Sequence, residues 1–285
     1  MTHPSETDLM GLGLARAVII RANRLIIGSN DSQPSQPTTG AALITIWQMD
    51  CHNVATDNQI SFKPENQISV RPQKEEMPSE FGAILGMKPT SISLDGDDGV
   101  VAVALGLYCF SQTNASISIG QVVFYDIGSG KTFGWRQFPA AASCVRVDSR
   151  QRKAIVGLEK RDNNDLPYVV VVDIDSGDTL KQLRSKMWGA RCLWTDWKRL
   201  VFTGDDDGLV MWDVAFGKDD LADKRLVDVD EVMATQLSGS CNGLPVTDRI
   251  CDIVFDGFHL VVYTRGSSRA AVRLLDFLKL NSIKF

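Results

Sequence analysis

The sequence is poor in several features on which particular classes of protein depend. Its three histidines, His3, His52 and His259, are too few and too dispersed for a zinc site built on His or Cys pairs. Uninterrupted apolar runs fall short of the roughly 18 residues that a membrane-spanning helix needs. The first residues, Met1 to Asp8, are polar and acidic, without the basic-then-apolar layout of a signal peptide. We therefore expect neither a metal centre nor a membrane protein.

An excess of positive charge is also lacking. Lys and Arg number 30 against 35 Asp and Glu, which gives a net charge of −5, and the pI is near 5.3. Affinity for a phosphate backbone comes mostly from clustered Lys and Arg. This balance argues against a general nucleic-acid binder.

The cysteines form no CxxC pair. They stand at Cys51, Cys109, Cys144, Cys192, Cys241 and Cys251, several of them inside apolar runs. The pattern predicts free thiols packed as small hydrophobic side chains in a reducing compartment, so we expect a cytoplasmic or nuclear protein. With 285 residues, 44% of them hydrophobic, the chain can form one large domain or two small ones and needs no disulfide to fold.

Short runs of β-branched and apolar residues predict an all-β chain. Gly, Asn, Asp, Ser or Pro clusters bound each run, as expected of strands joined by turns. Long amphipathic helical segments, of about 12 residues or more, are hard to find. The runs are 15–20, 24–29, 42–47, 99–105, 121–127, 153–158, 168–174, 199–204, 208–214, 259–264 and 271–277.

The runs recur in the same order, which indicates an internal repeat. Each of five units closes on an apolar strand that ends in Asp, and in most units a Gly-containing turn follows. The closing segments are Ile46-Trp47-Gln48-Met49-Asp50, Phe124-Tyr125-Asp126, Val172-Asp173, Met211-Trp212-Asp213 and Leu275-Asp276. Two polar insertions, near 57–80 and 219–246, lengthen the first and last intervals, and we expect them to be mobile surface excursions.

These segments carry a family resemblance. Residues 203–213, Thr-Gly-Asp-Asp-Asp-Gly-Leu-Val-Met-Trp-Asp, resemble the strand–turn–strand of a WD40 repeat. The turns at 127–131 and 174–178 resemble the one that leads to the outer strand of a blade. The resemblance covers 12–285, after a flexible N-terminus at 1–11, and implies a β-propeller of four-stranded blades.

The resemblance also implies structural roles for particular residues. A typical WD40 blade holds a buried hydrogen-bonded set of His, Ser or Thr, Asp and Trp. Thr203 and Trp212 fill two of these places and an Asp from 205–207 a third, but no unit has the Gly-His dipeptide that opens a typical repeat. Trp47, Asp126, Asp173, Asp213 and Asp276 mark the corresponding strand ends.

The number of blades is left open by the sequence. Five units are recognisable, whereas the family usually closes with seven, and 285 residues would hold seven lean blades of about 40 residues. Either the protein has five blades, or two further blades are unrecognisable, or the chain is part of a longer propeller. An open propeller would leave unpaired strand edges that something must cover.

Three motifs that suggest chemistry are better interpreted as turns or strands. Residues 128–132, Gly-Ser-Gly-Lys-Thr, lack the earlier Gly of a P-loop, since position 125 is Tyr. The acidic segments 95–99 and 205–208 lack the Glu that a calcium loop needs at its twelfth position. His259 is expected to be a strand residue rather than a catalytic base. No catalytic residue and no cofactor are therefore expected.

Two groups combine basic with other side chains. The first group contains Trp188, Arg191, Trp194 and Trp197. We favour the interpretation that it is a blade junction with the indoles in the core. Alternatively it is a partner-binding patch, since Trp and Arg are enriched at interface hot spots. Stacking on single-stranded nucleic acid is a third interpretation. Residues 146–153, with Arg146, Arg150, Arg152 and Lys153, are expected to surround a solvated turn.

These features favour a protein that binds rather than catalyses. We expect a protein–protein interaction scaffold that contacts its partner through propeller loops, with the two insertions as candidate contacts. The partner is expected to be another protein, in a multiprotein complex or among ubiquitin-ligase subunits, rather than a membrane or nucleic acid. A narrower alternative is the substrate-recognition propeller of an F-box-type ubiquitin-ligase receptor. An alternative from another class is a propeller enzyme, a hydrolase or dehydrogenase.

Overall fold

A computed structural model gives the fold of most of the chain. It describes residues 15–21, 23–30, 42–52, 59–70, 84–97, 99–111, 116–159, 168–183, 190–198, 200–205, 208–213, 227–229, 234–236, 249–256, 258–265 and 270–276. Within these ranges the regular structure is entirely β, and no helix that could span a membrane occurs. The predicted all-β class is confirmed.

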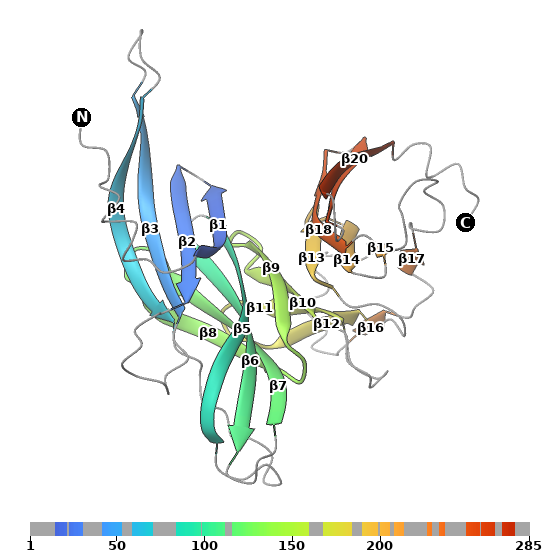
Figure 1. Cartoon of the computed structure of the whole chain (residues 1–285), viewed down its shortest axis with the longest axis horizontal. Helices are drawn as coiled ribbons and strands as arrows, with labels where there is room; N and C mark the ends of the chain where they lie inside the picture. The colour runs from blue at the N-terminus through green and yellow to red at the C-terminus, as the bar shows by residue number, and fades with distance from the viewer. Residues whose placement is uncertain are drawn as a thin grey trace. The chain divides into compact units, whose positions relative to one another are not determined.

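The strands form five sheets, which we number blades 1 to 5 in chain order (Figure 1). Blade 1 contains β1 (Ala15–Arg21), β2 (Arg24–Asn30), β3 (Ala42–His52) and β4 (Gln59–Val70). Blade 2 contains β5 (Ile84–Asp97), β6 (Val100–Ser111), β7 (Ser116–Asp126) and β8 (Thr132–Phe138). Consecutive strands pair antiparallel in both sheets.

The remaining blades repeat this order. Blade 3 contains β9 (Ala142–Asp148), β10 (Lys153–Leu158), β11 (Val169–Asp173) and β12 (Thr179–Leu183), with β16 (Val227–Val229) added in parallel beside β12. Blade 4 contains β13 (Cys192–Thr195), β14 (Leu200–Asp205), β15 (Gly208–Asp213) and β17 (Ala234–Gln236). Blade 5 contains β18 (Arg249–Phe255), β19 (His259–Arg265) and β20 (Ala270–Asp276). Each of the eleven runs predicted from the sequence coincides with a strand.

One register relates all five blades. The first residue of each second strand lies opposite the residue that ends the repeat on the third strand. The pairs are Arg24 with Gln48, Val100 with Asp126, Lys153 with Asp173, Leu200 with Asp213, and His259 with Asp276. The internal repeat is therefore a structural repeat. In blade 1 its closing position is Gln48 and not Asp50, because β3 continues to His52 in a longer pairing with β4.

The segment 57–80 was expected as a mobile polar insertion, and this expectation is wrong for its first half. Residues Gln59–Val70 form β4, which pairs along the length of β3. Ile68 and Val70 are buried, whereas 62–65 are exposed. Because only one face of this edge strand meets the core, its composition is polar.

The segment 219–246 also contains strands. Within it, β16 pairs with β12 and β17 pairs with β15 as the fourth strand of blade 4. The rest of this segment, and the remainder of 57–80, lie outside the described residues.

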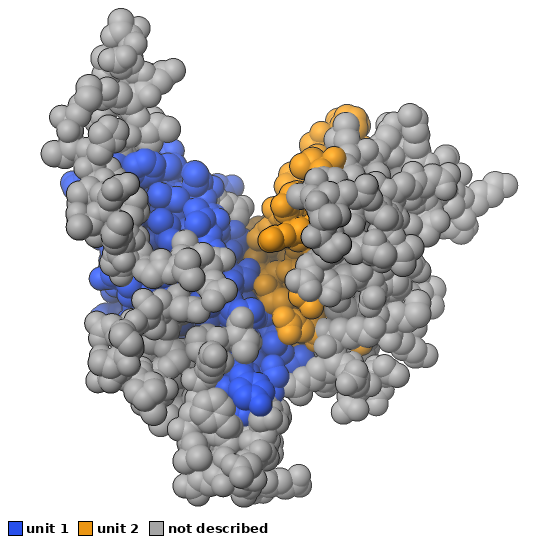
Figure 2. All heavy atoms as spheres, viewed as in Figure 1, with its two compact units in different colours: residues 1–142, 149–152, 174–177 blue, residues 143–148, 153–173, 178–285 orange. Residues whose placement is uncertain are grey.

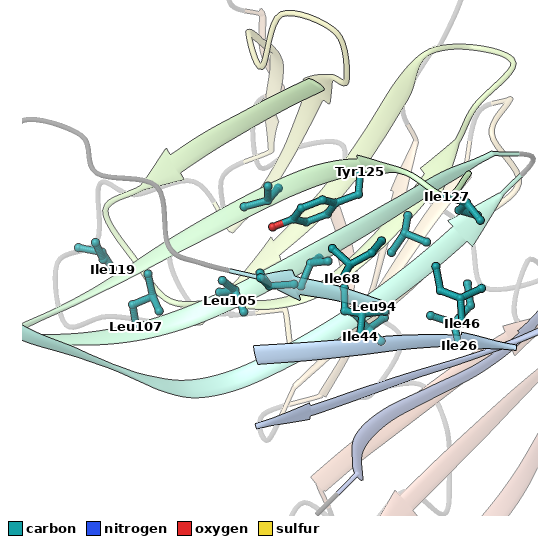
Figure 3. Close-up of a cluster of buried hydrophobic side chains, with 14 of the residues drawn as sticks. Ile26, Ile44, Ile46, Ile68, Leu94, Leu105, Leu107, Ile119, Tyr125 and Ile127 are labelled. Atoms are coloured by element: carbon teal, nitrogen blue, oxygen red, sulfur yellow. The ribbon is translucent and has the colours of Figure 1, made fainter. Parts of the chain in front are cut away.

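The chain divides into two compact units (Figure 2). Unit 1 holds blades 1 and 2 together with the turns at 149–152 and 174–177, and unit 2 holds the remainder. The core of unit 1 lies between its two blades, where isoleucines of blade 1 pack with aliphatic residues of blade 2 (Figure 3). Burial in this cluster raises the pKa of Tyr125 to about 12.

Among the described residues of unit 2, one cluster lies between blades 3 and 4 and another between blades 4 and 5. In both, glycine at the fifth position of the second strand lets the next blade approach. A Cβ on Gly157 would lie 2.9 Å from the Ala190 oxygen, and one on Gly204 would lie 2.5 Å from Cγ2 of Ile250. In unit 1, Gly28 stands at the same position of β2, where a Cβ would lie 2.7 Å from Cδ1 of Leu94.

Candidate interaction site

One backbone hydrogen bond recurs in blades 1 to 3, between the turn after the first strand and the residue that follows the closing position of the repeat. The turn between the first two strands contains a residue with positive φ, at Asn23 (59°), Gly99 (87°) and Arg152 (55°). The carbonyls of these residues accept hydrogen bonds from the N–H groups of Met49 (2.7 Å), Ile127 (2.8 Å) and Ile174 (3.1 Å), respectively. We call these three turns, with the 127–131 and 174–177 turns beside them, the turn rim. All of it belongs to unit 1.

Side chains connect the turns of the rim to one another. The Asn66 amide on β4 donates to the Ile127 carbonyl of the next blade (2.8 Å). The Ser149 N–H and hydroxyl both donate to Oδ2 of Asp97, at 3.0 Å each. The rim is thus a hydrogen-bonded network across three blades, and we expect it to hold its exposed side chains in fixed positions.

Arg152 is anchored twice in this network. Its Nε donates to Oδ2 of Asp175 at 2.8 Å, and a terminal nitrogen donates to Oδ1 of the same carboxylate. The guanidinium also lies 5.3 Å from the ring centroid of Phe133, a cation–π distance. The hydrogen bond from Arg152 lowers the pKa of Asp175. The expected turn is present at 149–152, with Arg150 exposed and the Arg152 side chain 42% exposed, but the expected solvation is wrong for Lys153, which is buried.

Asp126 organises the turn that follows β7. Its Oδ1 accepts from the N–H of Ser129 at 2.7 Å, and its carbonyl accepts from Gly130, which has a φ of 67°. The hydrogen bonds from Ser129 lower the pKa of Asp126. Asp126, Ser129 and Lys131 are exposed, so the turn presents both signs of charge to solvent.

A bidentate ion pair flanks the rim in blade 1. Nε of Arg24 lies 2.7 Å from Oε2 of Glu65, and a terminal nitrogen lies 2.9 Å from Oε1. The hydrogen bond from Arg24 lowers the pKa of Glu65. Glu65, which lies within 57–80, is therefore paired with Arg24 of its own blade.

The residues with expected structural roles lie on the third strands of their blades, except Thr203, which lies on a second strand. Trp47 occupies the same register position as Trp212, one residue before the closing position. Its indole N–H is buried without a hydrogen-bond partner among the described residues. Thr203 is buried in β14, and Asp173 is half-buried at the end of β11. Trp212, Asp213 and Asp276 lie in strands, but their side chains are outside the described part of the structure.

The tryptophans near residue 190 pack into different clusters. Trp194 lies against the cluster between blades 4 and 5 and makes an edge-to-face contact with Phe255, with ring centroids 5.3 Å apart. Trp197 lies against the cluster between blades 3 and 4, and Arg191 is half-buried. Trp188 lies outside the described residues.

Four cysteines have side chains that the structure describes, and most of these are buried. Cys109, Cys144 and Cys192 are buried and Cys251 is half-buried, and none of the four forms a disulfide. Burial raises the pKa values of Cys109 and Cys192. No group of three or more His, Cys, Asp or Glu side chains in those ranges could hold a metal ion.

His259 begins β19, and its Nδ1 lies 3.1 Å from Oδ2 of Asp256. It is a strand residue, as expected. The hydrogen bonds that Asp256 accepts from His259 and Phe258 lower the pKa of Asp256 to about 2.

The five sheets, with their common register, define an all-β protein built from propeller blades. No family model matches the chain, and no curated protein matches it. It is similar to the C-terminal WD40 domain of Sif2, with 10% identity, a TM-score of 0.36 and coverage of 95% of this chain and 84% of that one.

Two further solved structures are similar to the chain. For the WD40 β-propeller domain of Doa1 the identity is 11% and the TM-score 0.28, over 91% of this chain and 92% of that one. For the exo-β-1,3-galactanase of Phanerochaete chrysosporium the identity is 10% and the TM-score 0.44, over 92% of this chain and 60% of that one. Because all three TM-scores are below 0.5, the description of the chain as an all-β protein of propeller blades rests on its sheets and their register.

Proposed function

We propose that this protein is a non-catalytic interaction scaffold that binds a partner protein through the turn rim. The observation that supports this function is the network joining the turns of three blades, in which backbone and side-chain hydrogen bonds fix the loops that carry the exposed side chains. A surface that is already ordered loses little conformational entropy on binding. Such a surface can recognise a partner without chemistry.

The charges of the rim favour a protein as the partner. The rim carries the basic side chains of Lys131 and Arg152 and the acidic side chains of Asp126 and Asp175, so neither sign of charge dominates. A phosphate backbone would require a cluster of unpaired Lys and Arg. Mixed charge around fixed turns suits a protein surface whose own charges are complementary.

The test is affinity purification of the tagged chain from its native cells, with partners identified by mass spectrometry. We expect a stable set of partner proteins, and we expect its loss when the exposed rim residues Lys131 and Arg150 are both changed to Glu. The matched control is Arg136→Glu, an exposed position on β8 outside the rim, which should retain the partners.

Other outcomes would redirect or overturn the proposal. Recovery of cullin-ligase components would favour the substrate-receptor alternative. Quinone, metal or turnover in the purified protein would favour the enzyme alternative. Partner recovery that is equal for the rim variant and the control would exclude the turn rim as the binding surface.

A further inference from the structure

Blade 5 has one buried face and one exposed apolar face. Ile253, Leu260 and Val262 pack toward blade 4. On the other face lie Val254 of β18, Val261 and Tyr263 of β19, and Val272 of β20, which are paired across the strands as Val254 with Val261 and Tyr263 with Val272. Val254 is 53% exposed, Tyr263 38% and Val272 70%. We call these four residues the outer face of blade 5.

Tyr263 distinguishes this face from the contacts between consecutive blades. It is the fifth residue of its second strand, the position that Gly28, Gly157 and Gly204 occupy in blades 1, 3 and 4. In those blades even a single Cβ would collide with the following blade. A phenol at this position excludes the same close packing. The outer face is therefore shaped for a different kind of contact.

The charges at the two ends of this face are opposite. Asp256 precedes β19, and Arg265 ends it; both are exposed. The pKa of Asp256, about 2, keeps its carboxylate ionised at neutral pH. When two copies pack these faces against each other, a two-fold axis that lies between the faces, parallel to the sheets and perpendicular to β19, runs the two β19 strands antiparallel. Arg265 of each copy would then lie toward Asp256 of the other, with the apolar residues facing each other between them.

We propose that the outer face of blade 5 binds the same face of a second copy of this chain, forming a two-fold symmetric dimer. The apolar centre supplies the association free energy, because Val254, Tyr263 and Val272 lose their contact with water. The pairing of Arg265 with Asp256 selects the antiparallel orientation and disfavours the parallel one, which would place like charges together.

The test is sedimentation velocity of the full chain from about 1 µM to about 100 µM, a range that brackets micromolar dissociation constants. We expect a monomer–dimer equilibrium. Val272→Arg should raise the dimer Kd by about tenfold or more, because it buries a charge in the apolar centre. Arg265→Glu should raise Kd similarly, and added salt should weaken its effect.

Val18→Arg is the matched control. Val18 is 57% exposed on β1 of blade 1, so this change adds the same charge to another apolar surface and should leave Kd unchanged. Circular dichroism melting of each variant separates loss of dimer from loss of fold. A wild-type chain that stays monomeric throughout the range, or an equal effect of Val18→Arg and Val272→Arg, would overturn the proposal.

Discussion

Gly157 and Ala190 lie so close together that no side chain fits between them. A Cβ at Gly157 would stand 2.9 Å from the Ala190 oxygen, and it would also collide with the sulfur of Cys144. The Ala190 carbonyl in turn lies 3.5 Å from the Cys144 sulfur, within reach of a thiol hydrogen bond. Backbone, thiol and carbonyl thus form a contact between blades 3 and 4 that depends on the absence of a methyl group.

Gly157→Ala is accordingly expected to destabilise the protein by about 1–3 kcal/mol, the usual cost of overpacking a well-packed core. Urea unfolding measures this change. Gly128→Ala serves as the control, since its Cβ would meet only Oδ1 of Asp126, at 3.6 Å, and should shift stability by no more than about 0.5 kcal/mol. Equal effects of the two substitutions would contradict the close contact.

Trp194→Ala is expected to lower the free energy of unfolding by about 2–3 kcal/mol, because it removes a half-buried indole and its edge-to-face contact with Phe255. Chemical denaturation measures this loss. Lys198→Ala, at an exposed neighbouring position, is the control. If Trp194→Ala left stability unchanged but abolished partner recovery, the indole would belong to a binding surface instead.

The ion pair of Asp175 with Arg152 is expected to contribute to the free energy of unfolding in a way that depends on acid pH. The pKa of Asp175 is lower in the folded protein than in the unfolded chain because of Arg152. The contribution is therefore present above the ordinary Asp pKa of about 3.9 and is lost as pH falls through the folded-state value. Thermal unfolding between about pH 2 and pH 6 should show a shallower acid decline for Asp175→Asn than for the wild type. Identical pH profiles would exclude a stabilising role of the pair.

The buried thiols should resist alkylation in the native state. Burial raises the pKa values of Cys109 and Cys192, and the thiolate is the reactive form. Iodoacetamide at about pH 8, near the usual thiol pKa, should modify Cys251 before these two sites. Peptide mass spectrometry resolves the sites, and unfolding in urea should remove the difference. Rapid native labelling of Cys192 would contradict its burial.

The second and third strands of every blade were predictable from their apolar runs, whereas among the first and fourth strands only β1 was. Val169–Val172 are all buried, so their β-branched run is visible in the sequence. β4 and β8 each have an exposed side, and their polar residues hide the strand pattern. Asn66 and the Ile127 carbonyl are 61 residues apart in the chain, and no local pattern connects them. The same holds for Arg152 and Asp175, which only the fold brings together.

The recurring bond of the turn rim joins a backbone carbonyl to a backbone N–H in each of three blades. The acceptor carbonyls belong to Asn, Gly and Arg, and the donor N–H groups to Met and Ile. This hydrogen bond therefore does not depend on which side chain is present, provided that the turn residue tolerates a positive φ. New binding loops grafted at these positions should therefore keep this backbone hydrogen bond, whereas the side-chain contacts of Ser149 and Arg152 would be lost with their turn.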